Sequence, residues 1–280
     1  MNGTVLVTGA GGYIGRHVVL ALLERGVHVK ALDLRLDGVD PRAERVAADL
    51  FSADPEIYDR LGRPDVVLHM AWRDGFKHNS PAHLDDLPAH FHLIENLLAG
   101  GLKHLAVMGT MHEVGYWEGP IDESSPCNPA SLYGIAKNAL RETTFLSAKA
   151  HDAVAQWIRA YYIVGDDKFG NSIFSKLLEA AEEGRTTFPF TTGKNRYDFI
   201  SVDELARQIA AIVDQTEVDG IINACTGEPM SLAERVEAYI RDNNLDITLE
   251  YGAFPDRPYD SPGVWGDPAK IRRILASSAG

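Results

Sequence analysis

Residues 4–15, TVLVTGAGGYIG, place an apolar run directly before three glycines at every third position. The run at 4–8 is rich in β-branched residues and predicts a buried strand. Gly9 permits a tight turn after that strand, Gly12 lets a ligand approach the backbone closely, and Gly15 lets the next helix pack on the strand. The order of strand, glycine loop and helix therefore predicts a phosphate-binding turn at the start of a doubly wound α/β fold.

The segments that follow alternate between helical and strand-like patterns. Apolar residues at 13–25 recur at helical spacing, and Gly26 ends this helix. Such alternation predicts a parallel sheet that is covered by helices on both faces. In the first half of the chain we expect strands at 27–33, 46–50, 65–71, 105–109 and 155–160, and helices at 57–61, 83–100 and 131–151.

The pattern loosens after residue 165. The expected architecture is α/β: a Rossmann doubly wound parallel sheet with a small C-terminal substrate lobe. We place the nucleotide-binding Rossmann domain at 1–165, with returning pieces around 198–225, and the small lobe at 166–280. In the second half we expect helices at 171–184, 202–215 and 231–243, a strand at 220–224, and irregular structure at 185–201 and 251–267.

The composition is acidic, with 40 Asp and Glu against 27 Lys and Arg and a net charge of −13. This balance argues against a nucleic-acid partner, because phosphate-backbone binding needs an excess of basic residues. No apolar run approaches the ~18 residues of a membrane span, and no secretory signal is recognisable. Cys127 and Cys225 are too few for a disulfide framework and lack the spacing of a zinc site. We therefore expect a cytoplasmic protein with no membrane contact and no metal.

A carboxylate stands at the end of the second expected strand. Asp33 lies 18 residues after Gly15, where an acidic side chain hydrogen-bonds the ribose hydroxyls of an adenine dinucleotide. The pattern thus predicts a dinucleotide site and favours NAD as the cofactor. Arg35 follows closely and could bind a 2′-phosphate, which leaves NADP open.

A tyrosine and a lysine stand four residues apart in LYGIAK, at the start of the expected helix 131–151. This spacing puts Tyr133 and Lys137 on one helix face. A phenol titrates near ~10, and a nearby cation lowers that value. An isolated pair of this kind is an ordinary surface pair, but its place downstream of the glycine loop favours catalysis. Tyr133 would exchange a proton with a substrate oxygen while hydride moves to or from nicotinamide, and Lys137 could also hold the nicotinamide ribose.

Six segments in order resemble the extended short-chain dehydrogenases/reductases of the NAD-dependent epimerase/dehydratase family, which act mostly on nucleotide-activated sugars. A further segment, GDPAKIRRIL at 266–275, is similar to the closing helix of such proteins. The six segments are TGAGGYIG at 8–15, ADL at 48–50, HMA at 69–71, YGIAK at 133–137, RYDFISVDELA at 196–206 and NACTGEP at 223–229.

The resemblance implies a third catalytic residue, Thr110, which follows the fifth strand and hydrogen-bonds the substrate oxygen. Related dehydratases carry an acidic Asp-Glu pair just beyond this residue. Here the pair is His112 and Glu113, which puts dehydration in doubt, and both side chains could face the sugar. The cofactor residues that the loop, the strand ends and the resemblance together imply are Gly9, Gly12, Tyr13, Ile14, Gly15, Asp33, Arg35, Asp49, Leu50, Met70, Ala71, Tyr133 and Lys137.

On the substrate side, the resemblance implies that Arg196 grips a nucleotide diphosphate, for which a guanidinium is well suited. The alternative is a salt bridge from Arg196 to Asp198 or Asp203. The loop that begins at Trp72 follows a strand end, where ligands bind in doubly wound sheets. The candidate substrate residues are Trp72, Met111, His112, Tyr162, Asn171 and Arg196.

The first functional hypothesis is an NAD(P)-dependent oxidoreductase of carbohydrate biosynthesis. It would reduce the keto group of a nucleotide-activated 4-keto-6-deoxy sugar, with Tyr133 as the proton donor. The alternatives are an NAD-dependent nucleotide-sugar 4-epimerase and a uronate-type sugar dehydrogenase. Intact Thr110, Tyr133 and Lys137 argue against a non-catalytic NAD-binding scaffold. The resemblance also implies a homodimer that forms through the helices at 83–100 and 131–151.

Overall fold

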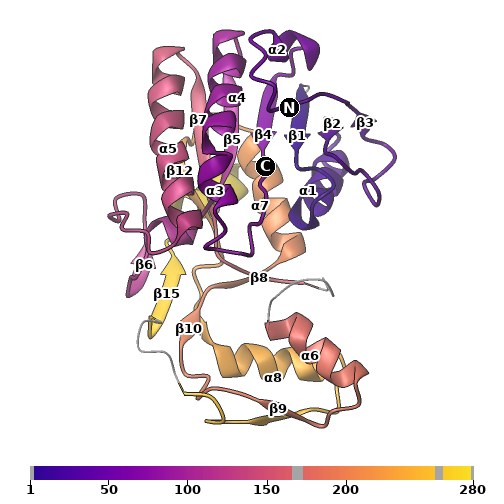
Figure 1. Ribbon diagram of the computed structural model, residues 1–280, viewed down its shortest axis with the longest axis vertical. Coiled ribbons are helices and arrows are strands. Elements are labelled where there is room, and N and C mark those ends of the chain that lie inside the picture. Colours follow the sequence, from indigo (N-terminus) through magenta and orange to yellow (C-terminus); the bar gives the residue numbers. More distant parts are fainter. Residues whose placement is uncertain (1–2, 166–172, 256–260, 279–280) are drawn as a thin grey trace.

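The computed structural model describes residues 3–165, 173–255 and 261–278 of the chain. Its larger, upper part is a layered α/β unit, and a smaller lobe lies below it (Figure 1). The core of the upper part is a seven-stranded parallel sheet with the order β12-β7-β5-β4-β1-β2-β3. Its strands are β1 (Thr4–Thr8), β2 (His28–Leu32), β3 (Glu44–Arg45), β4 (Val66–His69), β5 (His104–Thr110), β7 (Val154–Ala160) and β12 (Gly220–Ala224).

Helices cover both faces of the sheet because successive strand side chains point to opposite sides. Val5 and Val7 of β1 pack in one hydrophobic core, whereas Leu6 packs in the other. The first core contains α1 (Tyr13–Glu24), α7 (Val202–Val213) and α9 (Ala269–Ser278). The second contains α2 (Ile57–Arg60), α4 (Leu87–Ala99) and α5 (Leu132–Ala150), with α3 (Ala82–Asp85) beside α4 and α5. The predicted doubly wound fold is confirmed.

The lower lobe has a hydrophobic core of its own. Two helices, α6 (Ile173–Glu182) and α8 (Leu232–Asp242), pack with the parallel strands β9 (Thr187–Pro189) and β14 (Thr248–Glu250). Short strands lie between the lobe and the large sheet. They are β6 (Gly119–Ile121), β10 (Arg196–Tyr197), β13 (Met230–Ser231) and β15 (Gly263–Gly266) in one sheet, and β8 (Tyr162–Val164) with β11 (Phe199–Ser201) in another.

Several expected elements differ from the structure. The strand expected at 46–50 is absent: the two-residue β3 ends just before this stretch, and the chain then leaves the sheet. The helix expected at 83–100 is divided into α3 and α4, because Pro88 lacks the N–H that a continuous helix needs and stands in the first turn of α4. The stretch at 185–201 contains β9, β10 and β11, and the stretch at 251–267 contains β15. These strands are too short to produce a sequence period.

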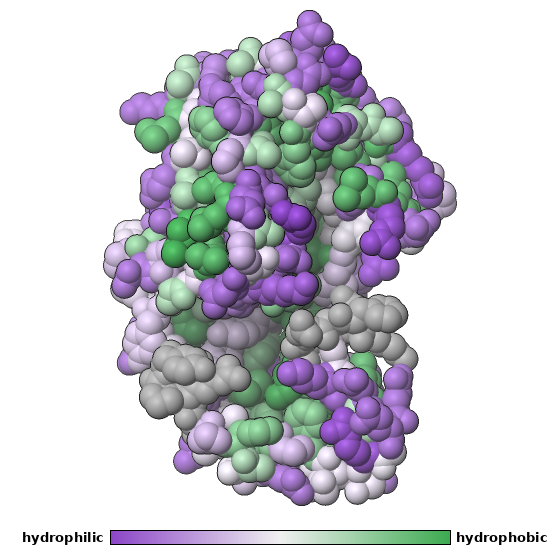
Figure 2. Space-filling model, viewed as in Figure 1, coloured by the Kyte–Doolittle hydropathy of each residue, from purple (hydrophilic) through white to green (hydrophobic). Residues whose placement is uncertain are grey.

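The outer surface of the upper part carries apolar side chains near α5. Figure 2 shows them gathered on that side of the molecule. Large exposed apolar residues there include Ile135 and Leu146 of α5, which are 43% and 69% exposed, and Leu84 of α3. Among the helices in the described ranges, none is long and apolar enough to cross a bilayer.

Candidate active site

The glycine loop joins β1 to α1 at the point where the strand order reverses. Gly9 has a φ of +73°, and a Cβ on it would lie 2.7 Å from the Ala71 nitrogen, so only glycine fits there. Gly12 precedes the first residue of α1, Tyr13, and no side chain caps this end of the helix. The N–H groups of Ile14 and the buried Gly15 in the first turn are therefore available to an anion.

A cavity of about 1130 Å³ opens beside this loop, at the carboxyl ends of β1, β2 and β4. Pockets for small ligands typically measure ~300–1,000 Å³, so the space suits an extended ligand such as a dinucleotide. Most of the cofactor residues predicted from the sequence line this one cavity. They are Gly9, Gly12, Asp33, Asp49, Leu50, Met70 and Ala71, and Trp72 lines it too.

Asp33 lies at the rim of the cavity, and the backbone holds its carboxylate. Its two oxygens accept hydrogen bonds from the N–H groups of Gly11 at 3.0 Å and Leu34 at 2.6 Å. Arg35 is exposed and does not line the cavity. A carboxylate at the rim fits ribose hydroxyls better than a 2′-phosphate, and the arginine that lines the cavity, Arg73, is ion-paired with Asp86. The residues present thus fit NAD.

Thr110, Tyr133 and Lys137 come together at the ends of β5 and α5. Ser131 caps α5 by accepting a hydrogen bond from the Gly134 N–H at 3.1 Å, which fixes where the helix starts. The Thr110 hydroxyl faces the Tyr133 phenol and, as a hydrogen-bond donor, opposes the rise in the phenol pKa. The Lys137 side chain is buried, and its Nζ donates to the Met108 carbonyl at 2.7 Å.

The titration of this pair differs from the sequence-based expectation. Burial raises the pKa of Tyr133, and it lowers the pKa of Lys137 to about 7. The expected lowering of the phenol pKa by Lys137 is therefore not seen. The reason is geometric: Lys137 Nζ lies 3.7 Å from the ring centre of Trp72 and bonds to a strand carbonyl, while desolvation dominates at both groups.

Aromatic rings surround Tyr133. Ring centres of His83, His78 and His112 lie 5.2, 5.5 and 6.2 Å from it, and Trp72 lies at 6.2 Å. Burial lowers the pKa of His112 to about 4, so this imidazole is neutral at pH 7.

Sequence reasoning did not single out His83, which holds Trp72 in place. Its Nδ1 accepts from the Trp72 indole N–H at 3.0 Å, and its Nε2 donates to the Lys77 carbonyl at 3.0 Å. These two bonds fix the orientation of the ring and place a proton on Nε2. The signal for His83 is weak, since it is one of several histidines in the polar stretch after β4.

A buried histidine pair lies behind the cavity wall. His69 hydrogen-bonds to the Thr8 hydroxyl and to His90, each at 2.8 Å. Burial lowers the pKa of His69 to about 3 and that of His90 to about 2, so both are neutral. The His90 ring stacks on Trp72, with 4.4 Å between centres. The pair therefore supports Trp72 from behind.

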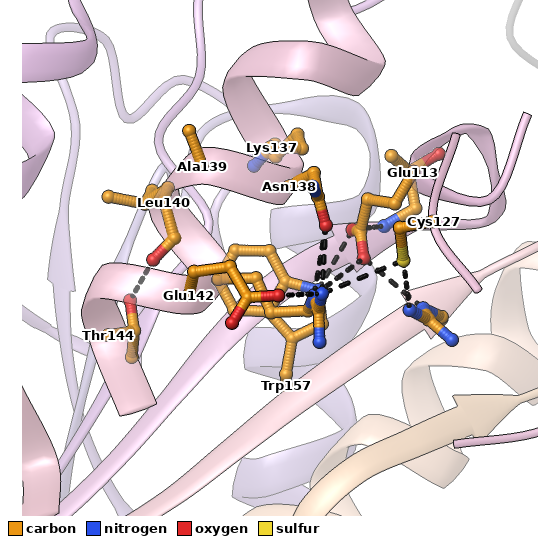
Figure 3. A network of polar contacts seen from close by, with 12 residues as sticks. Glu113, Cys127, Lys137, Asn138, Ala139, Leu140, Glu142, Thr144 and Trp157 are labelled. Carbon is orange, nitrogen blue, oxygen red and sulfur yellow. Dashed lines mark hydrogen bonds and ion pairs between the residues drawn. The ribbon is translucent and has the colours of Figure 1, made fainter. Parts of the chain in front are cut away.

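Glu113 lines no cavity in the described part of the chain, so the expectation that its side chain could face a sugar is wrong. Its side chain is fully buried and bound by Thr110, Trp157 and Arg159 (Figure 3). A buried carboxylate seeks cationic and N–H partners, and β7 supplies both here. The sequence pattern alone could not show that these partners lie behind Thr110.

Several predicted substrate residues lie away from the cavity. Met111 is buried in the hydrophobic core, and Tyr162 stacks on Tyr197 at 4.3 Å between ring centres. Arg196 is exposed, and its Nη2 donates to the Pro229 carbonyl at 2.7 Å. Asn171 falls outside the residues that the structure describes.

The chain has relatives that match almost its full length. It is 42% identical over 269 residues to the dTDP-6-deoxy-L-talose 4-dehydrogenase (NAD(+)) of Aggregatibacter actinomycetemcomitans, with 94% of this chain and 98% of that protein covered. It is 29% identical over 318 residues to a probable UDP-arabinose 4-epimerase 1 of Oryza sativa subsp. japonica, with 97% of this chain and 74% of that protein covered.

A solved structure shows the same fold. The UDP-glucose 4-epimerase of Thermus thermophilus in complex with NAD has a TM-score of 0.80 and 23% identity, with 98% of this chain and 93% of that chain covered.

A family model extends these matches to the site. The model described as the NAD dependent epimerase/dehydratase family matches residues 5–225. That range contains the glycine loop, the cavity lining, and the cluster of Thr110, Tyr133 and Lys137. The family resemblance predicted from the six sequence segments is confirmed, and it agrees with NAD as the expected cofactor. The chain belongs to the NAD-dependent epimerase/dehydratase family.

Proposed function

We propose that the protein is an NAD-dependent oxidoreductase that interconverts the ketone and the hydroxyl at C4 of a nucleotide-diphosphate-linked 6-deoxy sugar. The observation that carries this proposal is the cluster of Thr110, Tyr133 and Lys137 beside a dinucleotide-sized cavity. The 42% identity with a dTDP-6-deoxy-L-talose 4-dehydrogenase, which this chain matches over 98% of its length, supports the choice of substrate class.

Tyr133 serves as the proton donor when the ketone is reduced. Its raised pKa keeps the phenol protonated at neutral pH, which is the form that an acid needs. Thr110 donates to the phenol oxygen, and its hydroxyl can also hydrogen-bond to the substrate oxygen. Thr110 and Tyr133 would then both bind the same substrate oxygen. Bound NAD(H) supplies the hydride acceptor or donor.

Lys137 keeps the expected task of holding the nicotinamide ribose but not that of lowering the phenol pKa. Its ammonium is held by the Met108 carbonyl and lies over the ring of Trp72, which lines the cavity. With a pKa of about 7, it can bind ribose hydroxyls as a donor and still release a proton near neutral pH. We infer that Lys137 orients the ligand and passes the proton that Tyr133 must regain.

Trp72 lines the cavity and stands edge-on to Tyr133, so we take its indole as the wall between the dinucleotide and the sugar. His83 and His90 fix this indole, so the wall is rigid. We place the sugar between this wall and the rings of His78 and His112. The nucleotide diphosphate would extend toward the lower lobe, where Arg196 is exposed but is already bonded to the Pro229 carbonyl.

A nucleotide-sugar 4-epimerase is the second candidate, because curated 4-epimerases are also among the relatives. The chain covers only 74% of the rice 4-epimerase, against 98% of the dehydrogenase. An epimerase also has to turn the sugar within the site, whereas a reductase presents one face only. We therefore favour the oxidoreductase.

The experiment compares net redox with epimerisation. The purified protein is incubated with dTDP-6-deoxy-L-talose and NAD⁺, and in the reverse direction with a dTDP-linked 4-keto-6-deoxy sugar and NADH, while NADH is followed by its absorbance. We expect net turnover in both directions. Conversion of UDP-sugars into their C4 epimers with no net change in NADH would refute the oxidoreductase and favour the epimerase. Oxidation of free uronic acids alone would favour the uronate-type dehydrogenase.

A further inference from the structure

The carboxylate of Glu113 lies in the protein interior, directly behind the proposed catalytic threonine. It is 0% exposed. One oxygen, Oε1, accepts from the backbone N–H of Thr110 at 2.7 Å and from the indole N–H of Trp157 at 2.8 Å. The other oxygen, Oε2, accepts from Nε of Arg159 at 3.2 Å. Both oxygens are thus committed to protein donors, and neither is free to exchange a proton with a substrate.

Two guanidinium groups compensate the buried charge. Arg159 is itself fully buried, and Nε of Arg141 lies 3.8 Å from Oε2 of Glu113. Both arginines also contact the sulfur of Cys127, and Arg141 extends the cluster to Glu142 at the surface. Figure 3 shows Glu113, Cys127, Glu142 and Trp157 gathered in this network. A buried charge with such partners holds its surroundings rigidly, because breaking one contact leaves another charge unpaired.

The position of Thr110 depends directly on this cluster. Thr110 and Glu113 form a capping box around the short 3₁₀ helix Met111–Glu113. In this box the Thr110 hydroxyl accepts from the His112 N–H at 3.3 Å, while its proton is free to bond to the phenol of Tyr133. The close approach is built into β5, because a Cβ on Gly109 would lie 2.1 Å from Nε1 of Trp157.

We propose that Glu113, held by Arg159 and Trp157, is a positioning residue that fixes the Thr110 hydroxyl against Tyr133. The proposal rests on the proposed function, since it concerns the same reacting group. In this role Glu113 is neither an acid nor a base. Its carboxylate acts through the backbone N–H of Thr110 and touches neither substrate nor cofactor.

The first test is Glu113→Gln, with Glu142→Gln as the matched control at the exposed end of the same cluster. The amide keeps the shape of the Glu113 side chain, but its NH₂ group is a donor and now faces groups that also donate. At least one hydrogen bond of the carboxylate is therefore lost. We expect kcat to fall by about 10- to 100-fold, which corresponds to the loss of a hydrogen bond to a charged group. The KM for the nucleotide sugar should stay within about twofold, because no substrate contact is lost. The control should keep both constants.

A double-mutant cycle with Thr110→Ala separates positioning from general damage. If Glu113 acts through the Thr110 hydroxyl, adding Glu113→Gln to Thr110→Ala should lower kcat by less than about twofold. An equal loss of kcat on both backgrounds would overturn the proposal. Should Glu113→Gln fail to fold, Trp157→Phe removes one donor and leaves the ion pairs intact, and the same cycle is run with that variant.

A readout without substrate keeps this test independent of the proposed function. NMR of tyrosine labelled at Cζ, with the Tyr133 signal assigned by its loss in Tyr133→Phe, reports the hydrogen bond at the phenol. We expect the signal to move in Thr110→Ala and in Glu113→Gln, and to stay in Glu142→Gln. A signal that stays in Glu113→Gln refutes positioning whatever the wild-type activity. A signal that moves in a protein with no activity on dTDP-sugars refutes the proposed substrate and supports positioning.

Discussion

Lys137 is expected to lower the stability of the cofactor-free protein, and its replacement by methionine should reveal this. The side chain is 3% exposed, and burial lowers its pKa from 10.5 to about 7. Such a shift means that the charged form costs ~5 kcal/mol in the folded state at pH values below the folded pKa. Methionine has a similar length and carries no charge to desolvate, so it removes this cost.

The stability gained by Lys137→Met is smaller than this desolvation cost, because the lysine also makes two favourable contacts that methionine loses. Its bond to the Met108 carbonyl at 2.7 Å contributes about 1.5–3 kcal/mol, and its position over the Trp72 ring contributes about 1 kcal/mol. Subtracting these contributions leaves a net stabilisation of about 2 kcal/mol for Lys137→Met at roughly pH 6. A lysine at this position would thus be retained at a cost in the free energy of unfolding.

The pH dependence gives the sharper test. The folded pKa of Lys137 lies below the unfolded one, so the folded state binds fewer protons between about pH 7 and pH 10.5. Wild-type stability therefore rises through this window relative to the variant, and the advantage of Lys137→Met shrinks by up to ~1.4 kcal/mol per pH unit. The advantage should reverse near about pH 8.5, because a loss of ~1.4 kcal/mol per pH unit above the folded pKa removes ~2 kcal/mol within about 1.5 units.

The assay is urea unfolding of the two cofactor-free proteins at about pH 6, 8 and 10, since other groups titrate alike in both and cancel in the difference. Lys149→Met, at an exposed lysine of the same helix, is the control and should change the free energy of unfolding by no more than about 0.5 kcal/mol at any pH. A variant that is less stable than wild type at about pH 6, or a difference that does not depend on pH, would refute the reasoning.

Three further predictions concern the phenol, a buried carboxylate and the outer helix face. Tyr133→Phe should lower kcat by about 10²- to 10⁴-fold and leave NAD affinity, measured by calorimetry, unchanged within a few-fold; wild-type rates would remove Tyr133 from its role. Asp198 is fully buried and accepts four hydrogen bonds, two of them from Thr226, so Asp198→Asn should lower the free energy of unfolding by about 2–4 kcal/mol, whereas Asp203→Asn at the surface should have little effect. Leu146 is 69% exposed on α5, and Leu146→Glu should convert the expected homodimer into a monomer on size-exclusion chromatography; a monomeric wild type would contradict that prediction.

The main features of the fold are encoded locally, which is why they could be predicted. The apolar run at 4–8, followed by the glycines, predicts a strand and a phosphate-binding turn. The helices at 13–25 and 131–151 have clear apolar faces. The structure places β1, α1 and α5 there with ends that differ by only a few residues. Strands such as β10 and β15 could not be predicted, because two to four residues are held by partners from distant parts of the chain.

The same distinction explains the candidate site. The cofactor residues follow strand ends and the glycine loop, so the fold itself brings Gly9, Asp33 and Met70 to one cavity. The substrate residues were inferred from the family resemblance and from their place after strand ends. Tyr162 turns toward Tyr197 and Met111 enters the core, because in both cases packing partners that are distant in the chain decide the direction of the side chain.

The titration of Tyr133 and Lys137 shows why a motif does not determine its own chemistry. A spacing of four residues puts Tyr133 and Lys137 on one helix face. From this spacing alone one expects a phenolate paired with an ammonium. Burying such a pair costs the desolvation of two charges, which a single contact rarely repays. The structure instead directs Lys137 to a carbonyl and an indole, and burial moves both pKa values toward the neutral forms. A site that holds Tyr133 as a neutral acid before the substrate arrives is ready for ketone reduction, whereas alcohol oxidation must first remove a proton from the phenol.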